Sequence, residues 1–191
     1  MTTASSLLKA LPPRGPLDWL ALVILLDQIP RNCYRGEAAH VAFTFFDPLA
    51  RDVTLAAMGD GKDIPHADPR IRWAFARRFW FYLPLMHAED LATHERAVAE
   101  YARMAEDIEA VVSGTVARGD DCEEAREAAR VAAGDKEGAR TLARVQMEFE
   151  MKHYDIVRRF GRYPHRNGAM GRETTEDERT YLENGGETFG G

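Results

Sequence analysis

Apolar residues recur every three or four positions through most of the chain, and this spacing predicts helices rather than strands. The clearest stripe runs through residues 136–160 and includes Leu142, Phe149 and Ile156. No stretch keeps the two-residue alternation that is typical of a strand. The pattern therefore predicts an all-α fold of about seven helices arranged as antiparallel hairpins. Their expected ranges are 19–28, 48–58, 71–83, 88–112, 120–133, 136–160 and 176–184.

Polar residues, prolines and glycines indicate where these helices begin and end. Asp18 is expected to cap the first helix, and Pro30 to end it because proline has no N–H to donate. Asp–Pro pairs at 47–48 and 68–69 place an acidic cap before a proline at the first helical position. Gly161 is expected to stop the longest helix in a left-handed conformation.

The range 71–83 carries six aromatic side chains and is apolar nearly all round over its second half. A helix without a polar face is buried on all sides, so this segment is expected at the centre of the fold.

The length of 191 residues fits one domain. Residues 1–15 are small and punctuated by proline and glycine, so we expect a mobile tail followed by one helical domain over 16–191. The last helix is expected to start at a capping box, Thr175–Glu178.

Composition narrows the classes of partner. The net charge is −6, which gives no reason to expect nucleic acid or an anionic membrane as a partner. The longest apolar run, 19–26, is too short to span a bilayer. Two cysteines, Cys33 and Cys122, have neither metal-ligand spacing nor a disulfide pattern. These features predict a cytoplasmic protein, and since no nucleotide or metal motif is present, no cofactor is expected.

A first polar segment follows the opening helix, from Asp27 to Gly36. Asp27 is expected at the negative end of the helix dipole, where a buried carboxylate needs a cation. Arg31 and Arg35 are the nearest arginines in the sequence. The segment is either a structural ion pair that closes a turn or part of a binding site.

A second polar segment covers 84–94. If a helix begins by His87, then His87, Asp90 and His94 share one face and would suit a divalent metal. Alternatively, Asp90 or His87 merely caps the helix.

A third polar segment covers 158–172, where five arginines occur without an acidic residue. Several guanidinium groups and His165 in a loop with glycine and proline turns would form a pocket for phosphate or carboxylate. His153 lies on the apolar stripe of the preceding helix, where a histidine is either a core residue or a member of the site.

The segments LLDQIPRNCYRG (25–36), FYLPLMHAEDL (81–91) and RFGRYPHRNGAMGRETT (159–175) resemble the signature segments of the domain-of-unknown-function family 924. The resemblance implies a tetratricopeptide-like α-α superhelix, and the ending YLENGGETF is similar to fungal members. Relative to that family, the chain is expected to lack most of an N-terminal helical segment. The resemblance implies no activity. The signature positions it assigns to this chain are Asp27, Gln28, Arg31, Asn32, Arg35, His87, Glu89, Asp90, His153, Arg162, His165, Arg166, Asn167, Arg172 and Glu173.

Three functions are compatible with these segments. The first is a binding or scaffold protein in which arginines accept a small anionic ligand or a peptide. The second is a hydrolase-like enzyme in which His87 or His165 acts as acid or base and Asp27 or Asp90 orients it. In one form of this enzyme, His87, Asp90 and His94 hold a metal, with or without His153. In the third, the segments are structural locks between helix ends. The first two require the three segments to converge around one cavity.

Overall fold

The computed structural model describes residues 2–59 and 61–189, and every regular element within these ranges is helical. The all-α prediction is confirmed, and the expected number of helices is roughly in line with the structure. The long helices appear where the apolar stripes predicted them, whereas several short ones between them were missed.

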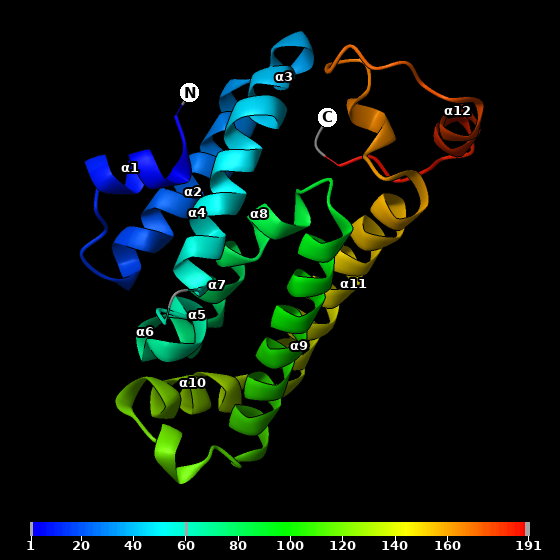
Figure 1. The fold of residues 1–191 in the computed structure, drawn as a ribbon. Coiled ribbons are helices and arrows are strands. Elements are labelled where there is room, and N and C mark those ends of the chain that lie inside the picture. Colours follow the sequence, from blue (N-terminus) through cyan, green and yellow to red (C-terminus); the bar gives the residue numbers. More distant parts are fainter. Residues whose placement is uncertain (1, 60, 190–191) are drawn as a thin grey trace.

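Two antiparallel helical hairpins form the frame (Figure 1). In the first, α2 (Pro16–Cys33) runs up and α4 (Asp47–Met58) runs back down. A short 3₁₀ turn, α3 (Ala39–Val41) and a π-helical segment (Ala42–Phe46) lead into α4 without a break. The sequence analysis missed this helical entry to α4.

The second hairpin pairs the two longest helices, α9 (Leu91–Ser113) and α11 (Lys136–Phe160). Helix α10 (Glu123–Gly134) crosses their lower end (Figure 1). Gly161 ends α11 with φ +70°, as predicted from its freedom to adopt a left-handed conformation.

The chain crosses between the hairpins as four short helices and a 3₁₀ turn rather than as the single helix expected over 71–83. Ala74 leaves the helical conformation, and Pro84 starts a new helix because it cannot continue the old one. The turns direct aromatic side chains such as Phe81 and Tyr82 inward, so the segment is central as predicted. The elements are α5 (Ile64–Ala67), α6 (Pro69–Arg72), α7 (Phe75–Arg78), the turn Phe79–Phe81 and α8 (Leu83–Met86).

Three predicted helix boundaries were wrong. Helix α2 begins at Pro16, directly after its N-cap residue Gly15. Asp18, which was predicted to be the cap, lies inside the first turn and accepts a hydrogen bond from the Arg14 N–H. Pro30 lies within α2, because a proline so near the end costs little and the Tyr34 N–H still donates to its carbonyl.

The third concerns Asp47. Its side chain makes no capping hydrogen bond, because its carboxylate is used elsewhere.

The ends of the chain also hold helices. Residues 1–15, expected to form a mobile tail, include α1 (Ala4–Ala10), capped by Thr3 and Ser6 and packed through Leu7 and Leu8 against the core. At the other end, α12 (Glu176–Glu183) begins at the predicted Thr175–Glu178 capping box.

The apolar core lies between the two hairpins, and no helix of the described residues is long and apolar enough to cross a membrane. A smaller apolar cluster under the C-terminal segment contains Ile156, Val157 and Tyr163. Fully buried members of the main core are Val23, Ala50, Val53, Ala57, Ile71, Phe81, Tyr82, Leu85, Ala97, Tyr101, Met104 and Ile108.

Candidate functional site

The three polar segments meet at the upper ends of the two hairpins, where α2 ends, α9 begins and α11 ends (Figure 1). His87 Nδ1 lies 2.7 Å from Asp27 Oδ1, which joins the first segment to the second. Arg166 Nη1 donates to the His87 carbonyl at 3.0 Å, which joins the second to the third. The predicted convergence of the three segments is confirmed.

A cavity of ≈ 340 Å³ opens where they meet, and we call it the His87 cavity. Helix α4 and the segment before it form one wall, and the turn after α8 and the loop after α11 form the other. Its lining residues are Phe43, Thr44, Asp47, Pro48, Arg51, His87, Ala88, Glu89, Arg166, Met170 and Arg172.

His87 is held by the buried carboxylate of Asp27. Because an ionised carboxylate only accepts hydrogen bonds, the ring donates its Nδ1–H to Asp27. Gln28 also donates to this carboxylate, and Arg31 lies 3.7 Å from it. The Nε2 atom of His87 makes no hydrogen bond with a described residue, and the side chain keeps 15% of its surface exposed. This leaves an imidazole nitrogen available at the cavity wall.

Burial and electrostatics keep His87 neutral. Burial lowers the pKa of His87, and the charge of Arg31 lowers it further, while Asp27 opposes both. Burial raises the pKa of Asp27, but His87 and Arg31 outweigh burial and leave it below its ordinary value. At neutral pH the trio is therefore an ionised Asp27, a cationic Arg31 and a neutral imidazole with its lone pair on Nε2.

Asp47 bridges two arginines from different segments. Arg31 Nη2 donates to Asp47 Oδ1 at 2.6 Å, and Arg166 Nη1 lies 3.3 Å from Asp47 Oδ2. The Asp47 side chain is 7% exposed, so two cations balance one nearly buried carboxylate. Asp47 therefore belongs to the site, although its position before Pro48 had suggested a helix cap.

Arg166 is enclosed between aromatic rings. Its guanidinium carbon lies 4.6 Å from the centroid of Phe43 and 4.4 Å from that of Tyr163. Burial lowers its pKa, but a guanidinium remains charged at any physiological pH. Stacking fixes the plane of the guanidinium and directs one edge at Asp47 and the His87 carbonyl.

Glu89 and Arg172 form the outer rim. Arg172 donates to both Glu89 oxygens, at 2.9 and 2.6 Å, and the Tyr163 N–H donates to the same carboxylate. Burial raises the pKa of Glu89, but these bonds outweigh it and the carboxyl stays ionised. This pair attaches the loop after α11 to the turn that carries His87.

His94 supports that turn from below and is not a metal ligand here. Its Nδ1 lies 2.6 Å from Glu150, its Nε2 lies 2.9 Å from the Ala88 carbonyl, and both acidic and imidazole side chains are fully buried. Burial raises the pKa of Glu150. The pair fixes the backbone directly after His87.

The proposed metal face is not formed. His87 ends α8 and Asp90 caps α9 by accepting from the Thr93 N–H, so His87, Asp90 and His94 do not lie on one helix. No group of three or more His, Cys, Asp or Glu side chains that could hold a metal occurs within residues 2–59 and 61–189. Asp90 is therefore a cap, the alternative that the sequence had left open.

Comparison with known proteins places this chain in a family. The family model described as "Bacterial protein of unknown function (DUF924)" matches residues 3–186. This chain belongs to that family. The solved structure of a protein of unknown function, ATU0120 from Agrobacterium tumefaciens, is 34% identical and superposes with a TM-score of 0.58. The match covers 90% of this chain and 70% of that one. None of the curated proteins matches the chain.

Two further histidines of this family member lie beside the cavity without lining it. His153 donates its Nδ1–H to the Phe149 carbonyl at 2.7 Å and stacks on Phe189. Burial lowers the pKa of His153 to about 3 and that of His165 to about 4. Neither ring nitrogen of His165 has a hydrogen-bond partner among the described residues. His87 lines the cavity and is oriented by Asp27, whereas His165 does neither, so His87 is the stronger acid–base candidate on geometry.

Four of the fourteen predicted ligand-binding residues line the cavity, namely His87, Glu89, Arg166 and Arg172, whereas Asn32, Arg35, Arg162 and Asn167 bond elsewhere. Asn32 and Arg35 are exposed and bond within their own turn. Arg162 pairs with Glu178 at 2.6 and 2.8 Å, and Asn167 donates to the same carboxylate at 3.1 Å. These last two hold α12 in place, so their role in this structure is structural.

Sequence reasoning missed four residues around the cavity: Phe43, Asp47, Arg51 and Tyr163. Arg51 follows Asp47 by four positions, which puts both on one face of α4. That spacing was a usable signal for Asp47 and Arg51. Phe43 and Tyr163 carry no such signal, because any aromatic residue would have been assigned to the core.

Proposed function

We propose that the His87 cavity binds a small molecule that carries a carboxylate or phosphate group. The observation that carries this proposal is Arg51, a guanidinium at the cavity wall whose ion-pair partner is its exposed neighbour Asp52. Three arginines and two carboxylates line the cavity, which leaves one cation without a buried counter-charge.

The other arginines are already committed within the protein. Arg166 is shared between Asp47 and the His87 carbonyl, and Arg172 is bound by Glu89 at both oxygens. A ligand would therefore contact Arg51 first, and reach the His87 Nε2 atom opposite. The expectation from the sequence was that arginines of the first and third segments, Arg31, Arg35, Arg162, Arg166 and Arg172, accept an anionic ligand. We replace it with a more local proposal centred on Arg51.

The size of the cavity favours a compact ligand over a peptide. A volume of ≈ 340 Å³ is near the lower end of ordinary ligand pockets, which span roughly 300–1,000 Å³. We therefore narrow the ligand class to small carboxylates and phosphates.

Calorimetry and thermal-shift measurements with inorganic phosphate and malonate as probes test this proposal. Binding of either probe should raise the melting temperature. Arg51→Gln should weaken binding about tenfold or more, since a charged hydrogen bond is worth about 1.5–3 kcal/mol.

Arg130→Gln is the matched control, because it removes the same charge from exposed α10. Equal loss of binding in both variants would indicate a general charge effect and reject the cavity as the site.

The Asp27–His87 pair favours a second candidate, a hydrolase. A neutral imidazole oriented by a buried carboxylate is suited to take a proton from water as the water attacks an ester. Arg51 and Arg166 would then stabilise negative charge on the substrate.

Hydrolysis of p-nitrophenyl phosphate and p-nitrophenyl acetate tests the hydrolase candidate. His87→Gln should abolish any turnover while phosphate binding persists. Asp27→Asn should lower turnover by about 10²-fold or more, because the imidazole loses its orientation. If the protein binds phosphate but hydrolyses neither ester, the hydrolase candidate is rejected and the binding function is supported.

Four predictions from the sequence stay predictions beside these proposals. We infer a cytoplasmic location from the composition, and partners other than nucleic acid from the negative charge. The tetratricopeptide-like class and the fungal-type ending rest on the resemblance of the signature segments.

A further inference from the structure

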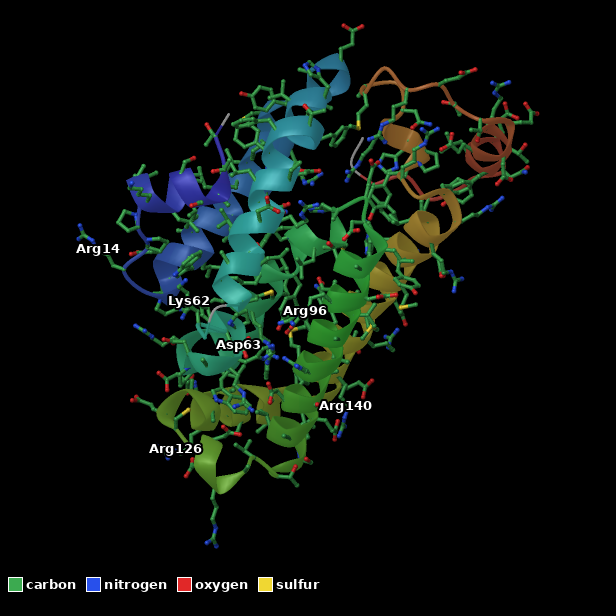
Figure 2. The ribbon with its side chains drawn as sticks, in the orientation of Figure 1. Arg14, Lys62, Asp63, Arg96, Arg126 and Arg140 are labelled. Carbon is green, nitrogen blue, oxygen red and sulfur yellow. The ribbon has the colours of Figure 1, made fainter. Side chains whose placement is uncertain are left out.

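A second and larger hollow lies at the opposite end of the molecule from the His87 cavity. Its volume is ≈ 890 Å³, and we call it the α10 groove. One wall is α6 and α7, the other is α10 with the first turns of α11, and Ile108 of α9 forms part of the floor. Figure 2 shows Arg126 and Arg140 labelled at this lower end.

The groove combines an apolar interior with a charged rim, and small side chains make up about a third of its lining. Alanine or glycine occupies six lining positions on α10, α11 and the α7 segment, which lets a neighbouring backbone come close. Trp73, Phe75 and Leu142 supply large apolar surface beside them. Val131 lies in the groove with 63% of its surface exposed, an unusual position for a valine within a helix. The groove therefore has the shape and chemistry of an unoccupied helix-packing surface.

The rim of this groove is acidic. Glu123 and Glu124 begin α10 and make no ion pair with a described residue. Of the two rim arginines, Arg70 is neutralised by Asp68, which it contacts through two hydrogen bonds from its guanidinium. Glu127 is neutralised by Arg130, whereas Asp135 adds one carboxylate along the same edge and Arg77 adds one cation. With Glu123 and Glu124, the rim keeps an excess of negative charge. A partner at this rim would have to be basic.

We propose that the α10 groove binds an amphipathic helix of another protein, with large apolar side chains facing the groove and lysine or arginine along its edge. Helix-in-groove recognition uses apolar anchors at i, i+3, i+4 and i+7, which correspond to about two to three turns. Small residues in the walls accept those anchors, and the unpaired carboxylates at the α10 N-terminus meet the basic edge.

Charge argues against two other occupants. A second copy of this chain carries a net charge of −6 and would be repelled by an acidic rim. An anionic membrane surface would be repelled for the same reason. A basic helix satisfies both the apolar walls and the rim.

A model peptide tests the proposal without knowledge of the natural partner. The probe is a fluorescent helical peptide of about 14 residues built from leucine and lysine, and its counterpart replaces each lysine by glutamate. Fluorescence anisotropy should show the lysine peptide binding at least about tenfold tighter than the glutamate peptide, since charges at the rim select the partner.

Two variants of the same helix locate the binding. Val131→Glu places a charged side chain in the apolar groove and should reduce binding of both peptides by about tenfold or more, without weakening the preference for the lysine peptide, because the added charge is negative. Ala133→Glu adds the same charge at an exposed position outside the groove and should leave binding unchanged. Circular dichroism confirms that both variants are folded. Equal effects of the two substitutions would overturn the proposal.

Charge reversal at the rim tests the basic character of the partner. The triple substitution Glu123→Lys, Glu124→Lys and Glu127→Lys should reverse the preference between the two peptides. A control variant carries the same three changes at exposed glutamates outside the groove, Glu37, Glu95 and Glu176, and should keep the original preference.

Three results would contradict the inference. They are unchanged preference after rim reversal, dimerisation through the groove seen by light scattering and lost in Val131→Glu, and binding to phosphatidylserine vesicles that Val131→Glu abolishes. Arg51→Gln should not affect peptide binding, so the outcome is independent of the His87 cavity.

Discussion

Among the described residues, two clusters of buried charged side chains lie between the helices, and one of them lines the His87 cavity. The cavity cluster joins α2, α4 and the loop after α11, whereas the second cluster joins α5–α7 to α9. The cavity cluster consists of Asp27, Arg31, Asp47, His87 and Arg166. The second, which we call the His66 cluster, consists of His66, Arg72, Arg78, Glu100 and Asp107.

Hydrogen bonding is saturated at the centre of the His66 cluster. Arg78 is fully buried, and each of its three guanidinium nitrogens has a partner: Tyr82, Asp107 and His66. Because Arg78 donates to His66 Nδ1, the other ring nitrogen donates to Glu100. No lone pair of the imidazole remains for a ligand.

The cavity cluster is less complete. Arg31 Nε and Arg166 Nε are buried without a hydrogen bond, and Asp47 Oδ2 has only the longer contact of 3.3 Å with Arg166. In the His66 cluster, Glu100 Oε1 also makes no hydrogen bond, but Arg96 lies 2.7 Å from it. His87 Nε2 bonds to no described residue, whereas both nitrogens of His66 are engaged. Evolved buried polar groups are usually satisfied, so unsatisfied ones beside a cavity indicate a place for a ligand. Buried charge alone therefore does not distinguish a ligand site from ion pairs that only hold helices together. Buried polar atoms without a hydrogen-bond partner do make that distinction.

Arg78→Met should give the largest effect, because it removes the centre of the saturated cluster. Asp107, His66 and Tyr82 would each lose a partner in a dry environment, and breaking a buried pair costs about 3–5 kcal/mol. Urea denaturation measures the loss. Arg77→Met, at the exposed neighbouring position, should change stability by no more than about 0.5 kcal/mol.

Arg166→Met should cost clearly less than Arg78→Met, about 1–3 kcal/mol, because Asp47 keeps its bond to Arg31. Methionine also retains contact with Phe43 and Tyr163. The exposed change Arg158→Met serves as control. A loss equal to that of Arg78→Met would mean that the cavity cluster is also a lock, and would weaken the binding proposal.

The sequence predicted much of the frame and part of the site. Apolar spacing located α9 and α11 well, because long amphipathic helices carry many independent signals. The 71–83 segment was predicted as one helix, since its aromatic residues show no polar face from which a change of direction could be read. Tertiary packing alone determines where that segment turns.

The sequence predicted that the buried carboxylate of Asp27 needs a cation, and it offered two nearby arginines as candidates. One of the two is not a partner. Arg31 does approach Asp27, yet Arg35 points into solvent. The decisive partner, His87, is 60 residues away, and Asp47 is 16 residues from Arg31. Contacts between helices depend on how the hairpins cross, and one sequence does not contain that information directly.

Acid should weaken the cavity region through its histidines. Burial lowers the pKa of His153, the hydrogen bond to the Phe149 carbonyl opposes this, and the nearby charge of Arg166 adds to the lowering, so that the pKa lies at about 3. Below pH about 6.5 the unfolded chain takes up a proton that the folded state refuses, so stability present above that pH is lost as the pH falls. In His153→Gln, the slope of unfolding free energy between pH 4.5 and 6.5 should be shallower by up to about 1.4 kcal/mol per unit.

Wild type and His153→Gln should have the same slope above pH 7, where the imidazole is neutral in both states. An unchanged slope below pH 6.5 would mean that His153 is protonated in the folded protein and that the apolar surroundings do not exclude charge.

Arg140→Ala should give the smallest effect, although its geometry is as good as that of any buried pair. Arg140 donates to both oxygens of Glu109 at 2.8 Å, and it links α11 to α9 (Figure 2). Both side chains are about half exposed, so water and salt screen their attraction and each pays side-chain entropy to keep one geometry.

The melting temperatures of Arg140→Ala, Glu109→Ala and the double variant should therefore agree with wild type within error, at low and at high salt. A clear loss in the single variants that is absent in the double would show that geometry, rather than burial and saturation, determines the strength of ion pairs in this fold. In that case the contributions of Arg78 and Arg166 to stability would depend only on the distances to their ion-pair partners. The difference between the two buried clusters would then no longer identify a ligand site.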